Sequence, residues 1–216
     1  MTREKLLVRV LDCGIVAVLR TPDREQLVKV AEALIDGGIT VAEITMTVPH
    51  ALEALREVRQ ALGDRLLLGA GTVLDSETAR AVILAGADFV VAPTLNCDVI
   101  RLCRRYDKLA IPGAFTPTEI LTAWEAGADI VKVFPADVVG PAFFKAVRAP
   151  LPQIKLMPTG GVDLATAAAF LQAGACCLGV GSQLVDPKAV ALGQFDRIRE
   201  LAAQYAAVVK EFRKSV

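Results

Sequence analysis

The stretch AGADIVKVFP, at residues 126–135, joins the end of a helix to a short apolar strand. Ala126-Gly127-Ala128 places a glycine where a helix can close in a left-handed turn, and Ile130–Phe134 follows as a run rich in β-branched residues. The same Ala-Gly-Ala phrase stands at 85–87 and 173–175, each time before another apolar run. This recurrence indicates a repeated unit in which a helix leads into a buried parallel strand.

Eight such strands are expected, with helical segments between them. They are Ile15–Leu19, Val41–Thr45, Leu66–Gly69, Phe89–Ala92, Leu109–Ile111, Ile130–Phe134, Ile154–Met157 and Cys177–Val180. An extra helix is expected before the first strand, over about Arg3–Asp12, and one last helix over about Pro187–Lys214. The eight units predict an α/β fold, a (β/α)8 TIM barrel that occupies residues 1–216 as a single domain. An open doubly wound sheet is the alternative, although no GxGxxG motif follows the first strand to support its dinucleotide-binding version.

Composition narrows the classes of function. The chain has 216 residues, 54% of them hydrophobic, and 24 basic against 24 acidic residues give a net charge of zero. A balanced charge gives no reason to expect a nucleic-acid partner, and no apolar stretch reaches the roughly 18 residues of a membrane helix. The first residues do not resemble a signal peptide, so we expect a cytoplasmic protein. One histidine and five cysteines without a CxxC pair predict free thiols and no metal site.

In a barrel of this kind the active site forms where the strands end, so polar residues there are candidates for function. Lys132 is the first anomaly, because it lies within the apolar run Ile130–Phe134. Burial disfavours the charged form of a lysine and lowers its pKa, and a neutral amine can attack a ketone. Lys132 is therefore a candidate Schiff-base nucleophile. The structural alternative is a lysine that only neutralises a carboxylate inside the barrel.

Glu43 is the second anomaly, because it lies within the apolar run Val41–Thr45. A carboxyl group whose pKa is raised by burial is suited to transferring protons. A lysine and a glutamate from different strands can meet inside the barrel mouth, where the amine would form an iminium and the acid would move protons. The alternative is an unreactive buried ion pair.

Glycine-rich turns follow the seventh and eighth strands. Thr159-Gly160-Gly161 and Gly181-Ser182 fall where many barrels bind phosphate, because backbone N–H groups there can approach an anion. Gly69-Ala70-Gly71-Thr72 offers a close backbone and a hydroxyl for a substrate carboxylate, and Arg20 is a candidate anion clamp at the end of the first strand. The structural alternatives are tight turns without a ligand and a solvated arginine.

These motifs together resemble the 2-dehydro-3-deoxy-6-phosphogluconate (KDPG) aldolase family, many of whose members also cleave 4-hydroxy-2-oxoglutarate (KHG). The resemblance runs from about Gly14 to Leu184. It rests on Glu43-Ile44-Thr45, Gly69-Ala70-Gly71-Thr72-Val73, Pro112-Gly113, Val131-Lys132-Val133-Phe134-Pro135-Ala136, Pro158-Thr159-Gly160-Gly161-Val162 and Gly179-Val180-Gly181-Ser182. It implies a metal-independent class I aldolase without a cofactor, usually a homotrimer, that splits a phosphorylated 2-oxo acid into pyruvate and glyceraldehyde 3-phosphate. The motifs are compatible with both the gluconate and the galactonate form of that substrate.

By position, the resemblance implies that Lys132 is the Schiff-base lysine and Glu43 the acid/base. The residues expected on the pyruvate side are Thr72, Arg20, Thr47, Pro93 and Phe134, and those on the phosphate side are Thr159, Gly160, Gly161, Gly181 and Ser182. One position departs from several members, which carry an arginine four residues after the glutamate, where this chain has Thr47. Arg20 is therefore the expected replacement for that arginine on the pyruvate carboxylate.

Two other functions compete with this prediction. A phosphosugar isomerase or epimerase on a similar barrel would need an acid–base pair or a metal, and not a buried lysine beside Phe134-Pro135. A non-catalytic phosphate-binding barrel would keep the glycine-rich turns without needing Lys132 or Glu43. The presence of both residues favours the aldolase.

Overall fold

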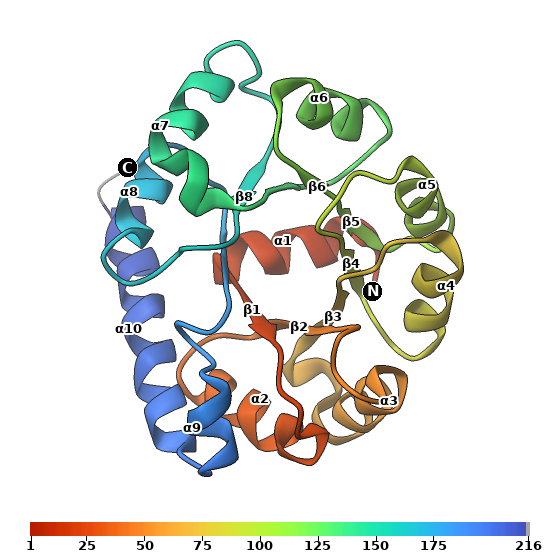
Figure 1. Ribbon diagram of the computed structural model, residues 1–216, viewed down its shortest axis with the longest axis vertical. Helices are drawn as coiled ribbons and strands as arrows, with labels where there is room; N and C mark the ends of the chain where they lie inside the picture. The colour runs from red at the N-terminus through yellow and green to blue at the C-terminus, as the bar shows by residue number, and fades with distance from the viewer. Residues whose placement is uncertain (215–216) are drawn as a thin grey trace.

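The computed structural model describes residues 1–214, in which helices and parallel strands alternate (Figure 1). The strands are β1 (Ile15–Leu19), β2 (Val41–Thr45), β3 (Leu67–Gly71), β4 (Phe89–Val91), β5 (Leu109–Ile111), β6 (Gly113–Ala114), β7 (Val131–Val133), β8 (Leu156–Pro158) and β9 (Leu178–Val180). The helices are α1 (Arg3–Cys13), α2 (Leu27–Asp36), α3 (Ala51–Leu62), α4 (Ser76–Leu84), α5 (Cys97–Arg105), α6 (Pro117–Glu125), α7 (Ala136–Arg148), α8 (Ala167–Gln172), α9 (Pro187–Ala191) and α10 (Phe195–Lys214), with short 3-10 turns at Arg24–Gln26 and Gly63–Arg65. Helices α2 to α10 ring the strands, whereas α1, the helix predicted before the first strand, crosses behind them (Figure 1). Within the described residues, no helix has the length and apolar character needed to cross a bilayer.

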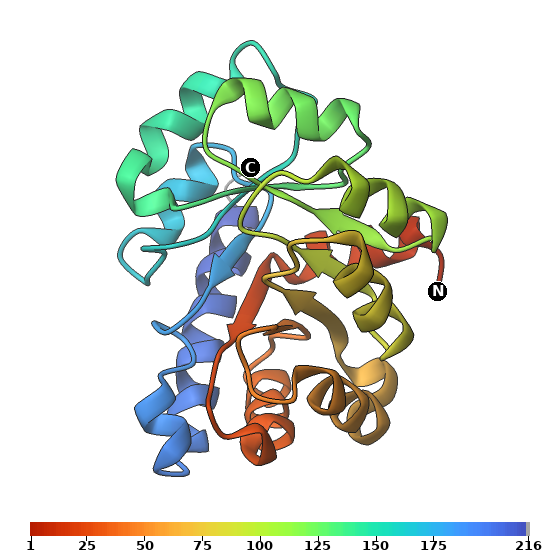
Figure 2. The same ribbon diagram turned by 45° about the vertical axis from the view of Figure 1, so that its right-hand side comes forward.

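Hydrogen bonds arrange the strands into two curled parallel sheets. The larger has the order β5-β4-β3-β2-β1-β9 and the smaller the order β6-β7-β8. Pro112 separates β5 from β6, because proline has no N–H to donate to a ladder. On the other side, a bridge between Thr159 and Gly179, and a 2.9 Å hydrogen bond from Cys176 N to Leu156 O, link β8 to β9. Figure 2 shows from a second direction that the ring of helices lies outside the strands.

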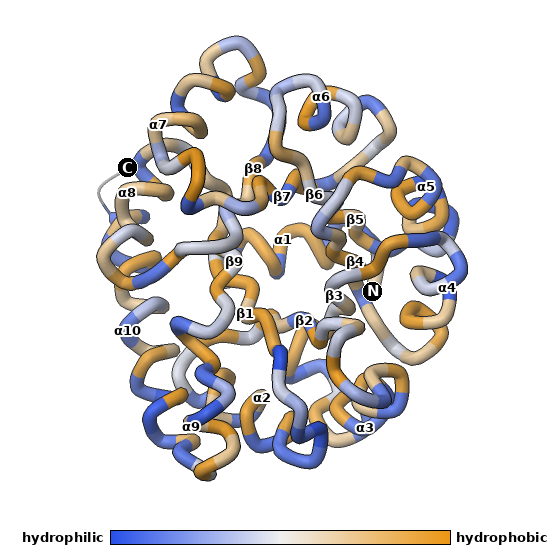
Figure 3. The backbone as a smooth tube through the Cα atoms, in the orientation of Figure 1, coloured by the Kyte–Doolittle hydropathy of each residue, from blue (hydrophilic) through white to orange (hydrophobic). Residues whose placement is uncertain are grey.

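Successive strand residues point to opposite faces, and this alternation creates two apolar cores. The inner core consists of Leu6, Val10, Val16, Val41, Leu67, Phe89, Val91, Leu109, Ile111, Ile130, Met157 and Cys177. Intervening positions, such as Ala17, Ala42 and Val90, belong to the outer core beneath the helices. Leu6 and Val10 come from α1, so this helix closes the amino-terminal end of the inner core. In Figure 3, β1 is hydrophobic along its length and the hydrophilic residues gather on peripheral helices and loops.

The single last helix predicted over Pro187–Lys214 is wrong. The chain forms α9 and α10 instead, separated by a turn in which Gly193 has φ 66°. Gly193 N donates to Val190 O at 3.0 Å and ends α9, because a glycine adopts the left-handed conformation at little steric cost. Because of this break, α10 has its own direction and packs along α2 and α8.

Leu6→Ala should lower the free energy of unfolding by about 2–5 kcal/mol, because it removes a fully buried side chain from the inner core. Val8→Ala is the matched control on the same helix; Val8 is 55% exposed, so its loss should cost no more than about 0.5 kcal/mol. Urea unfolding followed by circular dichroism measures both variants. Equal losses would contradict the position of α1 over the inner core.

Candidate active site

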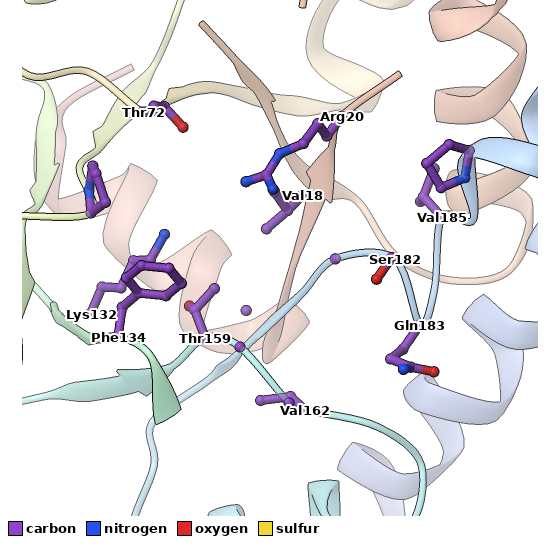
Figure 4. A pocket seen from close by; sticks show the side chains of 16 residues that line it. Val18, Arg20, Thr72, Lys132, Phe134, Thr159, Val162, Ser182, Gln183 and Val185 are labelled. Atoms are coloured by element: carbon purple, nitrogen blue, oxygen red, sulfur yellow. The ribbon is translucent and has the colours of Figure 1, made fainter. Parts of the chain in front are cut away.

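A cavity of about 250 Å³ opens where the strands end (Figure 4). Ten residues selected from the sequence line it: Arg20, Thr72, Pro93, Lys132, Phe134, Thr159, Gly160, Gly161, Gly181 and Ser182. The rest of its wall was not among the predicted site residues, and consists of Val18, Val162, Gly179, Gln183, Val185 and Pro187. Glu43 and Thr47, the other two predicted site residues, are not part of the wall.

The cavity continues the inner core toward the ends of the strands. Arg20, directly after β1, follows the inner residue Val16 by four positions, and Lys132 in β7 follows the inner residue Ile130 by two. Six other wall residues also follow an inner-core residue of the same strand region by two or four positions. They are Val18, Pro93, Phe134, Thr159, Gly179 and Gly181. This periodicity could have identified Val18 and Gly179 from the sequence, because both precede a predicted site residue by two positions.

Lys132 and Glu43 are both deeply buried, with 6% and 1% of their surfaces exposed. Glu43 pairs with Gly69 in the ladder between β2 and β3, and its carboxylate lies over Gly71. A Cβ atom at Gly71 would stand 2.6 Å from Glu43 Oε1, so only glycine leaves room for the carboxylate there. The third strand accordingly extends to Gly71, two residues beyond its predicted end.

Burial dominates the electrostatics of these two groups. It raises the pKa of Glu43 and lowers the pKa of Lys132 from their ordinary values. Each group opposes the shift of the other, while the nearby positive charge of Arg20 lowers both pKa values. Among the described residues, neither Lys132 nor Glu43 forms an ion pair within 4.0 Å. The geometry therefore places a lysine with a lowered pKa near a carboxyl group with a raised pKa, without the direct ion pair considered as the alternative.

Arg20 and Thr72 reach into the cavity from two sides (Figure 4). Thr72 follows the inward-facing Gly71 by one residue, so strand alternation alone would turn its side chain away. Its φ of 60° is left-handed and breaks the alternation. Thr47 is exposed, and its Oγ1 lies 2.7 Å from Thr45 Oγ1, so its hydroxyl is held at the end of its own strand.

Phe134 covers the amine of Lys132. The Nζ atom lies 5.0 Å from the centre of the ring, within the range of a cation–π contact. Residue Phe134 is 36% exposed, and its ring lies in front of Lys132 in Figure 4. A positive charge that forms at Nζ would therefore be stabilised by the face of the ring.

The turns after β8 and β9 provide backbone donors. Gly160 and Gly161 have φ values of 92° and 69°, which only glycine adopts readily. Within residues 1–214, no protein group accepts a hydrogen bond from the backbone N–H of Gly160, Gly161 or Ser182. Three N–H groups thus remain available to an anion in the cavity.

Thr159 lies between these turns and Lys132 in Figure 4. Its hydroxyl oxygen is buried, and the described residues offer it no hydrogen-bond partner. Gly179 makes this position possible, because a Cβ atom there would stand 2.2 Å from Thr159 Oγ1. A ligand in the cavity could supply the missing partner.

The charged groups at this cavity suit carbonyl and anion chemistry. Lys132 and Arg20 line it, and the charges of both lower the pKa of the Glu43 carboxyl group. The described part of the chain contains no group of three or more His, Cys, Asp or Glu side chains placed to hold a metal ion. The five cysteines are free thiols, as predicted.

Comparison with known proteins identifies the family. The family model described as "Aldolase: KDPG and KHG aldolase" matches residues 8–201. The chain belongs to the KDPG and KHG aldolase family. The 2-dehydro-3-deoxy-6-phosphogalactonate aldolase of Escherichia coli (strain K12) is 38% identical to this aldolase over 205 residues, 94% of this chain and 96% of that protein. The 2-dehydro-3-deoxy-phosphogluconate aldolase of Treponema pallidum (strain Nichols) is 38% identical over 186 residues, 86% and 88% of the two chains.

A solved structure supports the same relationship. This aldolase is similar to KDPG aldolase from Legionella pneumophila, whose crystal structure has pyruvate captured at low pH as a covalent carbinolamine intermediate. The TM-score is 0.86, with 29% sequence identity over 92% of this chain and 96% of that chain. The enzyme is accordingly a carbon–carbon lyase, a pyruvate-forming class I aldolase.

Arg20→Gln should raise the pKa of Lys132, because it removes a like charge that disfavours the ammonium form. The rate of imine formation with pyruvate, measured by quenching with borohydride, should then reach half its maximum at a higher pH than in the native enzyme. Arg101→Gln, which changes an exposed arginine paired with Asp98 on α5, should leave that midpoint in place. An unchanged or lower midpoint in Arg20→Gln would contradict the coupling.

Proposed function

We propose that this aldolase reversibly cleaves KDPG to pyruvate and glyceraldehyde 3-phosphate through an imine on Lys132. The observation that carries the proposal is the buried lysine near a buried glutamate, beside a cavity with three unpaired backbone N–H groups. The amine supplies a nucleophile for a ketone, the carboxyl group supplies a proton acceptor, and the N–H groups supply an anion site.

We further infer that the two sheets act as one closed (β/α)8 barrel that forms a single domain. In support, Gly113 N donates to Thr94 O at 3.2 Å beside the Pro112 interruption, and the Thr159–Gly179 bridge lies on the opposite side. The inward residues of both sheets also share one core. A closed barrel would hold Lys132 and Glu43 at a constant separation.

The first chemical step would be attack of the neutral Lys132 amine on C2 of the substrate. The ketone oxygen gains a proton to give a carbinolamine, and its loss as water leaves an iminium bonded to Nζ. The iminium then accepts the electron pair of the C3–C4 bond when that bond breaks. Burial favours the neutral amine before attack, and the ring of Phe134 lies where it can stabilise the cation afterwards.

Glu43 would move the protons. As the C3–C4 bond breaks, the carboxylate takes the proton of the C4 hydroxyl and glyceraldehyde 3-phosphate is released as the aldehyde. The remaining enamine gains a proton at C3, and water hydrolyses the iminium to release pyruvate and the amine. Burial raises the pKa of Glu43, and a carboxyl group with a raised pKa is suited to transferring protons in both directions.

The two charged ends of the substrate would occupy different walls. Arg20 and Thr72 are placed to bind the carboxylate next to the imine, in place of the arginine that several family members have at the position of Thr47. The phosphate would bind the N–H groups of Gly160, Gly161 and Ser182, because a dianion needs several convergent donors. The hydroxyl of Ser182 would add one further donor.

The galactonate epimer and KHG are the alternative substrates of this site. The galactonate and gluconate relatives are equally identical to this chain, which makes both sugar acids candidates for measurement. We also propose a homotrimer in solution, as the family resemblance implies.

Incubation with pyruvate and borohydride should add one reduced pyruvyl group to Lys132, because this lysine is buried within a strand at the cavity. Peptide mass mapping locates the label. Lys132→Ala should lose the label and nearly all activity while keeping its circular dichroism spectrum. Lys155→Ala, an exposed lysine just before β8, should keep both. Label on another lysine, or no label, would overturn the assignment.

Glu43→Gln should lower kcat by roughly 10²–10⁴-fold, because the amide keeps the shape of the carboxyl group but cannot accept the proton. Borohydride trapping of pyruvate should continue at a reduced rate, since Lys132 remains. Steady-state cleavage of KDPG and the trapping assay measure the two effects separately. A native kcat in this variant would exclude Glu43 as the proton acceptor.

Ser182→Ala should reduce kcat/KM for KDPG by an amount equivalent to about 1.5–3 kcal/mol, the contribution of one hydrogen bond to a charged group. The effect on KHG should be close to zero, because KHG has no phosphate. The informative quantity is therefore the ratio of the two kcat/KM values in the variant and in the native enzyme. If both substrates weaken equally, Ser182 does not bind the phosphate.

A further inference from the structure

A second cavity, of about 260 Å³, lies beside the active-site cavity. The two share Pro93 and Phe134 in their walls. Apart from Thr94 and Glu119, the rest of the second cavity's wall is apolar or glycine, and Phe115 and Pro135 belong to it. Phe134 therefore lies between the space around the Lys132 amine and a second, mainly apolar cavity.

The ring of Phe134 is close enough to touch the donor part of the substrate. Its centre lies 5.0 Å from Lys132 Nζ, and the imine carbon of a bound 2-oxo acid is bonded directly to that nitrogen. The C3 atom of the donor is the next atom along the chain. Being two bonds from Nζ, C3 can lie against the ring, and a carbon atom added on that side would then meet the ring.

The other directions around C3 have different occupants. The carboxylate of the donor would point to Arg20 and Thr72. The aldehyde part would extend toward Gly160, which also lines the cavity. The remaining direction around C3 is the one on the same side as the imine nitrogen. A substituent placed there would point toward Lys132 and the adjacent ring of Phe134. Phe134 is 36% exposed, so its side chain is not packed on every side. Because both cavities have Phe134 in their walls, removal of its side chain would join them.

We propose that Phe134 limits the size of the 2-oxo acid donor, and that the cavity behind it can accept a short aliphatic substituent on C3. The inference rests on the imine at Lys132 proposed above. The additional activity is the aldol addition of 2-oxobutanoate, or a similar donor, to glyceraldehyde 3-phosphate. In this reaction a C3–H proton leaves to Glu43 and the enamine carbon forms a bond to the aldehyde carbon. The aldehyde oxygen gains a proton, and water releases the 3-methyl product from the amine.

Phe134→Ala should raise the ratio of kcat/KM for 2-oxobutanoate to that for pyruvate by at least about tenfold, the usual discrimination of a pocket against one added carbon. Product formation from glyceraldehyde 3-phosphate is followed by mass spectrometry with each donor. The ratio cancels any loss of iminium stabilisation, because both donors place the same positive charge on the imine nitrogen beside the missing ring. Phe134→Val is a second variant, included in case Phe134→Ala does not fold. It should also raise the ratio, by a smaller factor, because valine leaves less added space than alanine.

Two controls separate size from other effects. Phe134→Leu keeps much of the bulk without the aromatic face, so both donors should slow while their ratio stays within about threefold of the native value, less than 1 kcal/mol. Phe115→Ala enlarges the second cavity from its other wall and leaves the barrier in place, so its ratio should also stay native. An unchanged ratio in Phe134→Ala and Phe134→Val, with pyruvate still trapped on Lys132, would overturn this inference alone. Failure of the native enzyme to trap pyruvate on Lys132 would instead overturn the proposed function.

Discussion

Alternate residues of a β-strand face the same side, and in this aldolase that period organises both the core and the site. Val16, Val41 and Ile130 fill the inner core at the amino-terminal end, and α1 closes it from below. Two residues further along their strands, Glu43 and Lys132 occupy the same inward face. A shift of either strand by one residue would move these groups to the outer core and replace them by apolar side chains. The packing of the inner core therefore fixes the position of the two groups proposed to react.

Burial in that position has an electrostatic consequence. An amine and a carboxyl group that are removed from water both shift toward their neutral forms, and their mutual attraction opposes the shift. In this enzyme burial is the larger effect, because the carboxylate lies over Gly71 without forming a direct ion pair with Lys132. Arg20 adds a like charge near the amine and favours its neutral form further. The proposed mechanism depends on this balance, since an ammonium ion has no lone pair with which to attack a ketone.

The sequence predicted the parts of the structure that follow from local periodicity. Each of the eight apolar runs overlaps a parallel strand, and ten of the twelve predicted site residues line one cavity, because inward-facing positions at strand ends converge. The features that were not predicted depend on single backbone conformations. Gly193 breaks the last helix, and the left-handed φ of Thr72 breaks strand alternation. Thr47 was predicted to line the site because it follows a strand. Its hydroxyl lies within hydrogen-bonding distance of Thr45 instead, and this contact depends on the local path of the backbone, which the sequence pattern does not reveal.

The ionisation of Lys132 can be observed directly by ¹³C NMR on enzyme prepared with lysine labelled at Cε. The resonance is assigned by its absence in Lys132→Arg and then titrated in the free enzyme. We expect its midpoint to lie below the ordinary lysine value of about 10.4, because burial and Arg20 together outweigh the attraction of Glu43. A midpoint at or above the ordinary value would show that Glu43 holds the amine as an ammonium ion, and it would contradict the view that burial prepares Lys132 as a nucleophile.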